Sequence, residues 1–313
     1  TKVMSALNIL DNLLSIILEN IPKSDEQKYG DILVSPNASI SLKMRTCFQL
    51  KSLNTNDAID ELNRGFKSKS ALLKHEIAYV MGQMNNEYAI PYLSLILKDE
   101  NQEIIVRHEA AEALAAIGNI SVKPLLLKYS KHVNKELKET CLLGLKTLEN
   151  NNGNKDKKSN HNSIDPANAF DDMELNKNNI EYIKKIENIY LDKNECLYNR
   201  YKAMFTLRDI GSNECIKILC KGFNDDSALF KHEICFVLGQ LMNSIAINDL
   251  INVLKNKNEH EMVRHEAAEA LGSIANDKCL PIIKEYLNDD KIVVKQSCQV
   301  ALDIHNFWNN DDV

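Results

Sequence analysis

The sequence predicts an all-α protein, folded as a helical-repeat solenoid with two pseudo-symmetric halves of about four helix-pair units each. Three observations lead to this prediction. First, the 313 residues include only 6 prolines and 10 glycines, a composition that favours helices. Second, a long stretch of the sequence occurs twice at one constant offset. Third, a shorter motif recurs within each copy at the spacing of one helix pair.

The duplication is visible when the two halves are compared directly. SALLKHEIAYVMGQM at 70–84 returns as SALFKHEICFVLGQL at 227–241, and VRHEAAEAL at 106–114 returns unchanged at 263–271. Both pairs are 157 residues apart. We therefore expect two halves of equivalent fold.

Each half contains repeat units of its own. Its two His-Glu motifs lie 33 residues apart, which is the length of a helix-turn-helix repeat unit. In one unit an apolar stripe at helical spacing runs from Leu73 to Met84, and residues 90–97 resume it after a polar break. Each unit should thus contain two helices, and Gly82 and Gly239 should mark close helix contacts near helix ends. Weaker units flank the strong ones, at 44–50, 137–145, 201–207 and 294–302.

The repeats divide the chain into four segments. We expect an N-terminal capping helix and a polar insertion in residues 1–43, the N-terminal half in 44–148, a flexible Asn/Lys-rich linker in 149–179, and the C-terminal half in 180–313. The linker could instead be a partner-binding tail. A tether that lets the two halves face each other is the simpler interpretation.

Charge and composition exclude several classes of protein. The formal charge of -6 argues against affinity for phosphate backbones, so we expect no direct nucleic-acid partner and favour a cationic one. No stretch approaches the roughly 18 apolar residues of a membrane span, and the run at 13–18 lacks the flanks of a signal peptide. We expect a cytoplasmic protein without membrane contact. The 8 cysteines form no CxxC pair, which favours reduced, buried thiols.

Four His-Glu dipeptides occupy equivalent positions in four units. Such positions on neighbouring units lie roughly 8 to 10 Å apart and point the same way, so imidazole and carboxylate groups can surround one ion. Two histidines and a carboxylate per half favour non-haem Fe(II) and oxygen chemistry, and two halves can hold two ions about 3.5 to 4 Å apart. The dipeptides are His75-Glu76, His108-Glu109, His232-Glu233 and His265-Glu266.

Adjacent helical residues diverge by about 100°, so a histidine and the glutamate beside it need not contact the same ion. Some of the glutamates are then free to hold a primary ammonium group by charge-assisted hydrogen bonds. The alternative is a set of surface pairs repeated only because the units were duplicated, which four dipeptides in register make improbable. A fifth dipeptide, His260-Glu261, has Glu103-Ile104 as its counterpart and is predicted to lie on the surface.

Other candidates near the dipeptides have weaker signals. Glu112 and Glu269 follow a histidine by one helical turn and could orient its ring, although helix-surface charges are the commoner explanation. Tyr79 and Phe236 are equivalent and are expected to be packing residues, since only one of them has a hydroxyl. Neither the second histidine of a zinc peptidase nor a Gly-rich phosphate loop is found in the sequence.

Together these motifs, with RYKAMFTLRDIG at 200–211 and DDSALF at 225–230, resemble the deoxyhypusine hydroxylase family from about Met44 to Asp303. The resemblance implies HEAT-like repeats and a cytoplasmic oxidoreductase, a monooxygenase with two Fe2+ ions and O2 as co-substrate. Such an enzyme hydroxylates the deoxyhypusine side chain on eukaryotic translation initiation factor five A to form hypusine. This factor would be the protein partner, and we expect the enzyme to be a monomer.

The same resemblance implies a role for each site residue. His75, His108 and Glu109 would ligate one iron, and His232, His265 and Glu266 the other. Glu76 and Glu233 would hold the amine of the substrate. The main alternative is a non-catalytic helical-repeat scaffold that binds a protein partner. A bilin-lyase-like repeat protein shares the architecture, but has no need of four registered His-Glu pairs.

Overall fold

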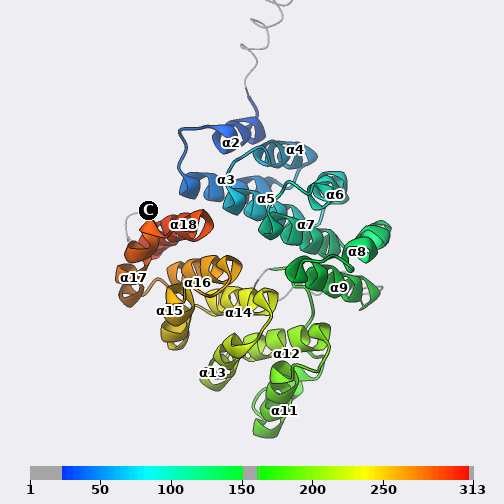
Figure 1. Ribbon diagram of the computed structural model, residues 1–313, viewed down its shortest axis with the longest axis vertical. Coiled ribbons are helices and arrows are strands. Elements are labelled where there is room, and N and C mark those ends of the chain that lie inside the picture. The colour runs from blue at the N-terminus through cyan, green and yellow to red at the C-terminus, as the bar shows by residue number, and fades with distance from the viewer. Residues whose placement is uncertain (1–22, 151–160, 162, 310–313) are drawn as a thin grey trace, which may run out of the picture.

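The computed structural model describes residues 23–150, 161 and 163–309. Within this part of the chain all regular secondary structure is helical, which confirms the predicted all-α class. The helices form eight consecutive pairs, four in each half, and in each pair an outer helix precedes an inner helix (Figure 1). The capping helix predicted near the N-terminus lies outside the described residues.

In the N-terminal half, inner helices stack side by side and outer helices cover their backs. The outer helices are α2 (Asp25–Val34), α4 (Asn56–Gly65), α6 (Ile90–Lys98) and α8 (Lys123–Tyr129). The inner helices are α3 (Ile40–Leu53), α5 (Ala71–Gln83), α7 (Ile104–Ile117) and α9 (Lys135–Asn150).

The C-terminal half repeats this arrangement at the same offset. Its outer helices are α11 (Ile180–Leu191), α13 (Asn213–Lys221), α15 (Ile247–Lys255) and α17 (Leu280–Glu285). Its inner helices are α12 (Leu197–Ile210), α14 (Ala228–Leu241), α16 (Glu261–Ile274) and α18 (Ile292–Asn309). The short helix α10 (Met173–Asn176) lies between the halves in sequence.

The segment predicted to be a polar insertion contains helix α2. Ser24 begins this helix with a capping box, in which its side chain accepts a hydrogen bond from the backbone of Gln27. α2 buries Leu33 and packs on α3 and α4, as the outer helix of the first pair. Apolar periodicity missed it because only Gly30 and Leu33 are buried, and it also placed the start of the half at residue 44, inside α3.

Close packing between inner helices depends on glycine. A Cβ added to Gly82 on α5 would lie 2.7 Å from the Cα of Ala113 on α7, and one on Gly239 would lie 3.2 Å from the Cα of Ala270. The predicted close helix contacts at these two glycines are therefore present. They bring the backbones of neighbouring inner helices, and the side chains in front of them, close together.

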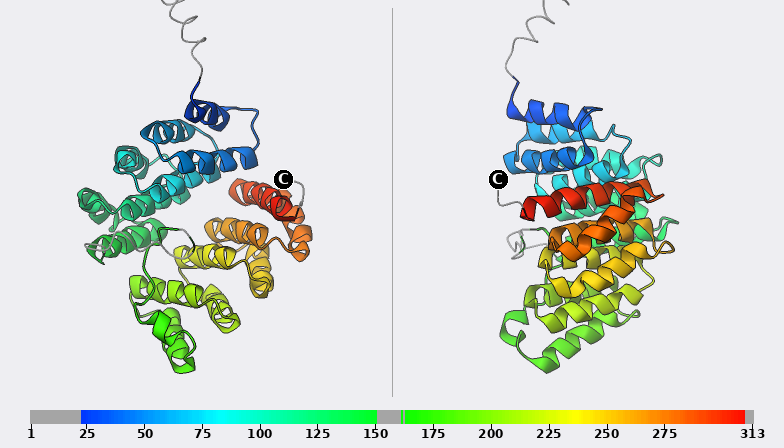
Figure 2. Two further views of the ribbon diagram at one scale, coloured as in Figure 1. Left: turned by 180° about the vertical axis from the view of Figure 1, so that it is seen from behind. Right: turned by 90° about the vertical axis from the view of Figure 1, so that its left-hand side faces the viewer.

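The two halves face each other with their inner helices, and they meet at both ends (Figures 1 and 2). At one end α18 meets α3 and α5, and Ser70 Oγ at the start of α5 donates to Gln296 Oε1 of α18 at 2.7 Å. At the other end α9 meets α12 and α14, where the equivalent Ser227 Oγ donates to Glu139 Oε2 at 2.7 Å. These contacts join the two halves at both ends of the space between the inner helices.

The later part of the predicted flexible linker is held between the halves. We call residues 163–170 the linker strap. Gln83 accepts a hydrogen bond from the Ile164 backbone at 2.8 Å and donates to its carbonyl at 3.1 Å, and Gln240 donates to Ser163 at 3.1 Å. Asp165 forms a buried 2.7 Å ion pair with Arg208. The strap differs from the expected free tether because side chains of both halves satisfy its polar groups.

Two further findings bear on the expectations. All eight cysteines are free; six of them are buried, Cys220 is partly buried and Cys196 is exposed. Among the described helices, none combines the length and apolar character needed to cross a bilayer.

Candidate metal centre

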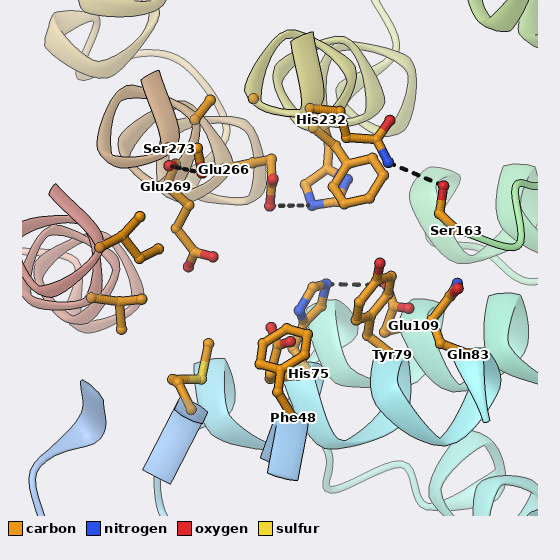
Figure 3. A pocket seen from close by; sticks show the side chains of 18 of the residues that line it. Phe48, His75, Tyr79, Gln83, Glu109, Ser163, His232, Glu266, Glu269 and Ser273 are labelled. Atoms are coloured by element: carbon orange, nitrogen blue, oxygen red, sulfur yellow. Dashed lines mark hydrogen bonds and ion pairs between the residues drawn. The ribbon is translucent and has the colours of Figure 1, made fainter. Parts of the chain in front are cut away.

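The four histidines of the registered dipeptides converge at the centre of the molecule. His75 on α5 and His108 on α7 meet His232 on α14 and His265 on α16, and the measured distances between their ring centroids are 5.3 to 5.8 Å. Each of the four residues is at most 6% exposed. The duplication therefore places two histidines from each half in one buried cluster, and Figure 3 labels one of them from each half, His75 and His232.

The imidazoles of this cluster lack ordinary partners. Seven ring nitrogens are buried without a hydrogen-bond partner among the described residues: both nitrogens of His75, His108 and His232, and Nε2 of His265. Leaving a buried polar atom unsatisfied costs about 1 to 3 kcal/mol. A ligand such as a metal ion would satisfy several of these nitrogens at once, so the residues present fit a metal centre.

Ligand atoms gather in two groups of three. The first group is His75, His108 and Glu109, and the second is His75, His232 and His265, with the atoms of each group within 4.8 Å of one another. The first group is the predicted set of the N-terminal half. The predicted set of the C-terminal half is not among these groups. His232 Nε2 does lie 3.5 Å from Glu266 Oε2, but the third residue grouped with His232 and His265 is His75.

Burial controls the charge of the histidines. It lowers the pKa of His108, His232 and His265 well below the usual value, and neighbouring imidazoles add to this effect. Burial also disfavours the charged form of His75, but the Glu109 carboxylate 3.2 Å from its Nε2, together with Glu76 and Glu269, raises the pKa of His75 above its usual value. Neutral imidazole is the form that binds metals, so three of the four rings are held ready for coordination.

Glu76 and Glu233 lie beside the cluster and are buried, with 7% and 4% exposed. Burial, and then the nearby carboxylate of Glu269, raises the pKa of Glu76 to about 8. Burial, and then Asp165 and Glu109, raises the pKa of Glu233 to about 8. A cation brought into this space would stabilise both carboxylates in their ionised form.

Most of these side chains line one cavity of about 390 Å³ between the halves (Figure 3). His75, Glu76, His232, Glu233 and the carboxylates of Glu109 and Glu266 form part of its wall. His108 and His265 are fully buried behind this wall. The cavity therefore offers a ligand simultaneous access to imidazole nitrogens and to buried carboxylates.

Glu112 and Glu269 also line the cavity, so the expectation that they are helix-surface charges is wrong. Ser297 Oγ donates a 2.7 Å hydrogen bond to Glu269 and lies 3.5 Å from His265 Nδ1. Glu269 can thus orient the His265 ring through Ser297. Sequence spacing could not distinguish this inward position from an outward one, because a helix in this fold contacts neighbours around most of its circumference.

The remaining predictions near the site have mixed outcomes. The rings of Tyr79 and Phe236 contact each other edge-on at 5.9 Å, as expected of packing residues, but both also line the cavity. His260 is exposed at the start of α16 and lies outside the cluster, as predicted.

Sequence reasoning missed three lining elements. The first is the linker strap, which contributes Ser163, Ile164 and Asp165 to the wall. One signal was available, since Ile164 is the first aliphatic residue after Leu148 and marks the end of the Asn/Lys-rich composition. The other two elements are α3 and α18, whose lining residues carry no metal-ligand motif: Ser41, Met44, Arg45, Phe48, Val300, Asp303 and Ile304.

Comparison with known proteins agrees with the fold and the duplication. A family model of HEAT repeats matches residues 59–146 and 216–303. The deoxyhypusine hydroxylase of Candida albicans is 42% identical over 94% of this chain and 96% of its own length. That of Rattus norvegicus is 40% identical over 93% of this chain and 95% of its own length.

A solved structure gives the same result in three dimensions. The structure of human deoxyhypusine hydroxylase in complex with glycerol matches with a TM-score of 0.86 and 38% sequence identity, covering 95% of this chain and 99% of the human one. Sequence and structure thus agree over nearly the full length of both chains. The chain belongs to the deoxyhypusine hydroxylase family.

Proposed function

We propose that this protein is a di-iron monooxygenase that hydroxylates the deoxyhypusine side chain of eukaryotic translation initiation factor five A to form hypusine. It acts as a cytoplasmic monomer, with that factor as its protein partner. The observation that carries the proposal is the cluster of four buried imidazoles, in which seven ring nitrogens have no hydrogen-bond partner among the described residues, beside buried carboxylates in one cavity. Membership of a family of hydroxylases supports the reaction class.

The metal-holding residues are those that the family resemblance implies. His75, His108 and Glu109 hold one ion, and the ligand atoms of this set are already within 4.8 Å of one another. His232, His265 and Glu266 would hold the other. When bound, two ferrous ions supply the activation of O2.

The carboxylates hold the substrate. Deoxyhypusine is a lysine whose side-chain nitrogen carries an aminobutyl group, so it brings two ammonium groups joined by an apolar chain. Glu76 and Glu233 are buried acceptors that match such cations. They fix the chain so that one of its carbons lies next to the imidazole cluster, which is the positioning contribution to catalysis.

A non-catalytic scaffold is the second candidate and explains less. A scaffold binds through its surface, and nothing in that role requires seven buried ring nitrogens without partners. Their cost in folding free energy is offset only when a ligand occupies the cluster.

The test is metal analysis of protein purified without chelators, followed by incubation with O2, an added chemical reductant and the deoxyhypusine-bearing factor. We expect about two irons per chain and a product heavier by one oxygen atom in mass spectrometry. A chain with no stoichiometric metal and no oxygen transfer would be a scaffold.

A further inference from the structure

The cavity breaks the pseudo-symmetry of the two halves. It is lined on one side by α3 and α18, which we call the open side. Their equivalents α12 and α9 meet on the opposite side, which we call the closed side, and among the described residues neither contributes to the wall. The duplication alone would make the two sides equivalent, but within the described part of the chain only the open side lines the cavity.

The open side has small or accessible side chains at the cavity edge. Phe48 on α3 lines the cavity and is still 43% exposed. Ser41 lies on the same wall, where its hydroxyl donates to the Gln299 carbonyl of α18 at 3.3 Å. Arg45 and Asp303 form a 2.6 Å ion pair across the edge, and the Arg45 side chain is 56% exposed. Solvent therefore reaches the cavity edge between these helices.

The closed side is filled by larger residues at equivalent positions. Tyr198 stands where the open side has Ser41, and Tyr201 stands where it has Met44. Phe205, the equivalent of Phe48, is fully buried, as is Tyr201. The remaining space beside α9 is a cavity of about 10 Å³, too small for more than a water molecule.

The linker strap completes this closure. Thr147 of α9 donates to the Pro166 carbonyl at 2.5 Å, and the Phe170 backbone donates to Thr206 of α12 at 2.9 Å. The strap is thus tied to both helices of the closed side. No second copy of the strap exists to cover the open side, because the linker occurs once in the chain.

The carboxylates of the cavity fall into two pairs along the same direction. Glu269 accepts a hydrogen bond from Ser297 of α18. Glu76 interacts electrostatically with Glu269 and with Lys51 of α3, so Glu76 and Glu269 form the pair of the open side. Glu112 and Glu233 interact with each other and with Tyr201 of α12, so they belong to the closed side. The imidazole cluster lies between the two pairs, and Figure 3 shows Glu269 at one end and Ser163 of the strap at the other.

We infer that the substrate side chain enters only from the open side, between α3 and α18, and that the two carboxylate pairs hold its two ammonium groups in a fixed order. This inference rests on the proposed function. The lysine stem lies against Phe48 and Met44, and the inner ammonium group meets Glu76 and Glu269. The terminal ammonium group meets Glu233 and Glu112 at the closed end. The aminobutyl carbons between the two nitrogens then lie beside the cluster.

This order of binding gives different roles to residues at equivalent positions of the two halves. Phe48 becomes a substrate-contacting residue, while its equivalent Phe205 is part of the core. Glu269 becomes a holder of the inner ammonium group as well as a partner of Ser297. A protein substrate can present only an extended side chain through this edge, which selects for a long diamine-bearing lysine.

The test converts the open side into a copy of the closed side. The double variant Ser41→Tyr/Met44→Tyr introduces the residues that the chain itself carries at 198 and 201. We expect two irons per chain as in the wild type, and kcat/KM for the deoxyhypusine-bearing factor lowered by about a hundredfold or more, because entry is blocked. The matched control is Leu42→Tyr, an aromatic on the same helix at a 37% exposed position outside the cavity wall, which should keep wild-type kcat/KM.

A second variant tests the same entry route in case the double variant fails to fold. Phe48→Ala removes an exposed side chain and should raise KM by about tenfold with kcat little changed, while Phe48→Leu should restore most of the loss. Wild-type kcat/KM in an iron-loaded double variant would overturn the entry route. If the double variant loses iron, an unchanged KM in Phe48→Ala overturns it instead. A wild-type enzyme inactive on the same substrate would refute the proposed function rather than the route.

Discussion

At the scale of single residues, the site is defined by side chains buried without partners. The four clustered histidines have equivalent positions in sequence, yet they differ in electrostatic surroundings. Glu109 raises the pKa of His75, whereas burial lowers the pKa of the other three. In the proposed function the histidines hold the metal and the neighbouring carboxylates Glu76 and Glu233 hold the substrate. Substitutions at the two kinds of residue should therefore have separable effects.

Glu233→Gln should weaken substrate binding and leave the metal in place. The amide keeps the shape of the side chain but loses the charge-assisted hydrogen bond to an ammonium group, worth about 1.5 to 3 kcal/mol, so kcat/KM should fall roughly tenfold or more. Steady-state kinetics and iron analysis measure the two effects separately. Glu261→Gln, an acid of the surface dipeptide, is the matched control. Loss of iron in Glu233→Gln would contradict the assignment.

His108→Ala should impair the metal centre itself. His108 is fully buried, so the substitution removes one ligand and leaves no accessible replacement. We expect at most half of the wild-type iron content and loss of hydroxylation, measured by metal analysis and mass spectrometry. His260→Asn should retain both, because His260 is exposed and the amide can still cap α16. A variant at position 108 with full iron content would count against the ligand role.

At the scale of helices, the approach of α5 to α7 brings His75 next to His108. Gly82 permits this approach, and its equivalent Gly239 does so between α14 and α16 with more space. Substituting each glycine therefore measures how much close helix packing contributes to stability at a tighter and at a looser contact.

Gly82→Ala should destabilise the protein by about 1 to 3 kcal/mol, because its new Cβ would meet the backbone of Ala113 at 2.7 Å. Gly239→Ala should cost less, since the corresponding distance is 3.2 Å. Urea denaturation measures both changes in the free energy of unfolding. Equal or reversed effects would mean that helix contact does not limit these positions.

At the scale of the whole molecule, the centre joins the two halves. His75 belongs to both groups of potential ligands, and the second group takes its other members from the C-terminal half. Ions held by the two proposed ligand sets would therefore lie where α5 meets α14 and α16, and would connect the halves. The linker strap adds a second tie, through Gln83 on one half and Gln240 and Arg208 on the other.

Removing the metal should lower the Tm of the protein by several degrees, because binding to the folded state alone adds to its stability. Differential scanning calorimetry before and after chelation, with iron content verified in each sample, measures the change. His75→Ala should respond much less to chelation, since it lacks the shared ligand. An iron-loaded wild type with the same Tm as the chelated protein would show that the ions do not hold the halves together.

Much of the fold was predictable because the duplication is visible as repeated segments in the sequence. The 157-residue offset and the 33-residue spacing gave the helix pairs and their number, and the register of four His-Glu dipeptides selected the site residues. Helix α2 was not predicted, because it buries too few side chains to show an apolar periodicity. The position of the linker strap was not predicted, because it is set by contacts with distant residues such as Gln83 and Arg208.

The sequence by itself determined the repeat architecture, the two equivalent halves and the residues of the cluster, since local periodicity decides which face of each helix is buried. Only the tertiary structure decided that His75 lies within reach of histidines of the other half, that Glu112 and Glu269 face inward, and that one of two equivalent sides is closed. These features depend on how the halves pack against each other and on where a single linker lies. Contacts between residues more than a hundred positions apart leave no periodic trace in either repeat.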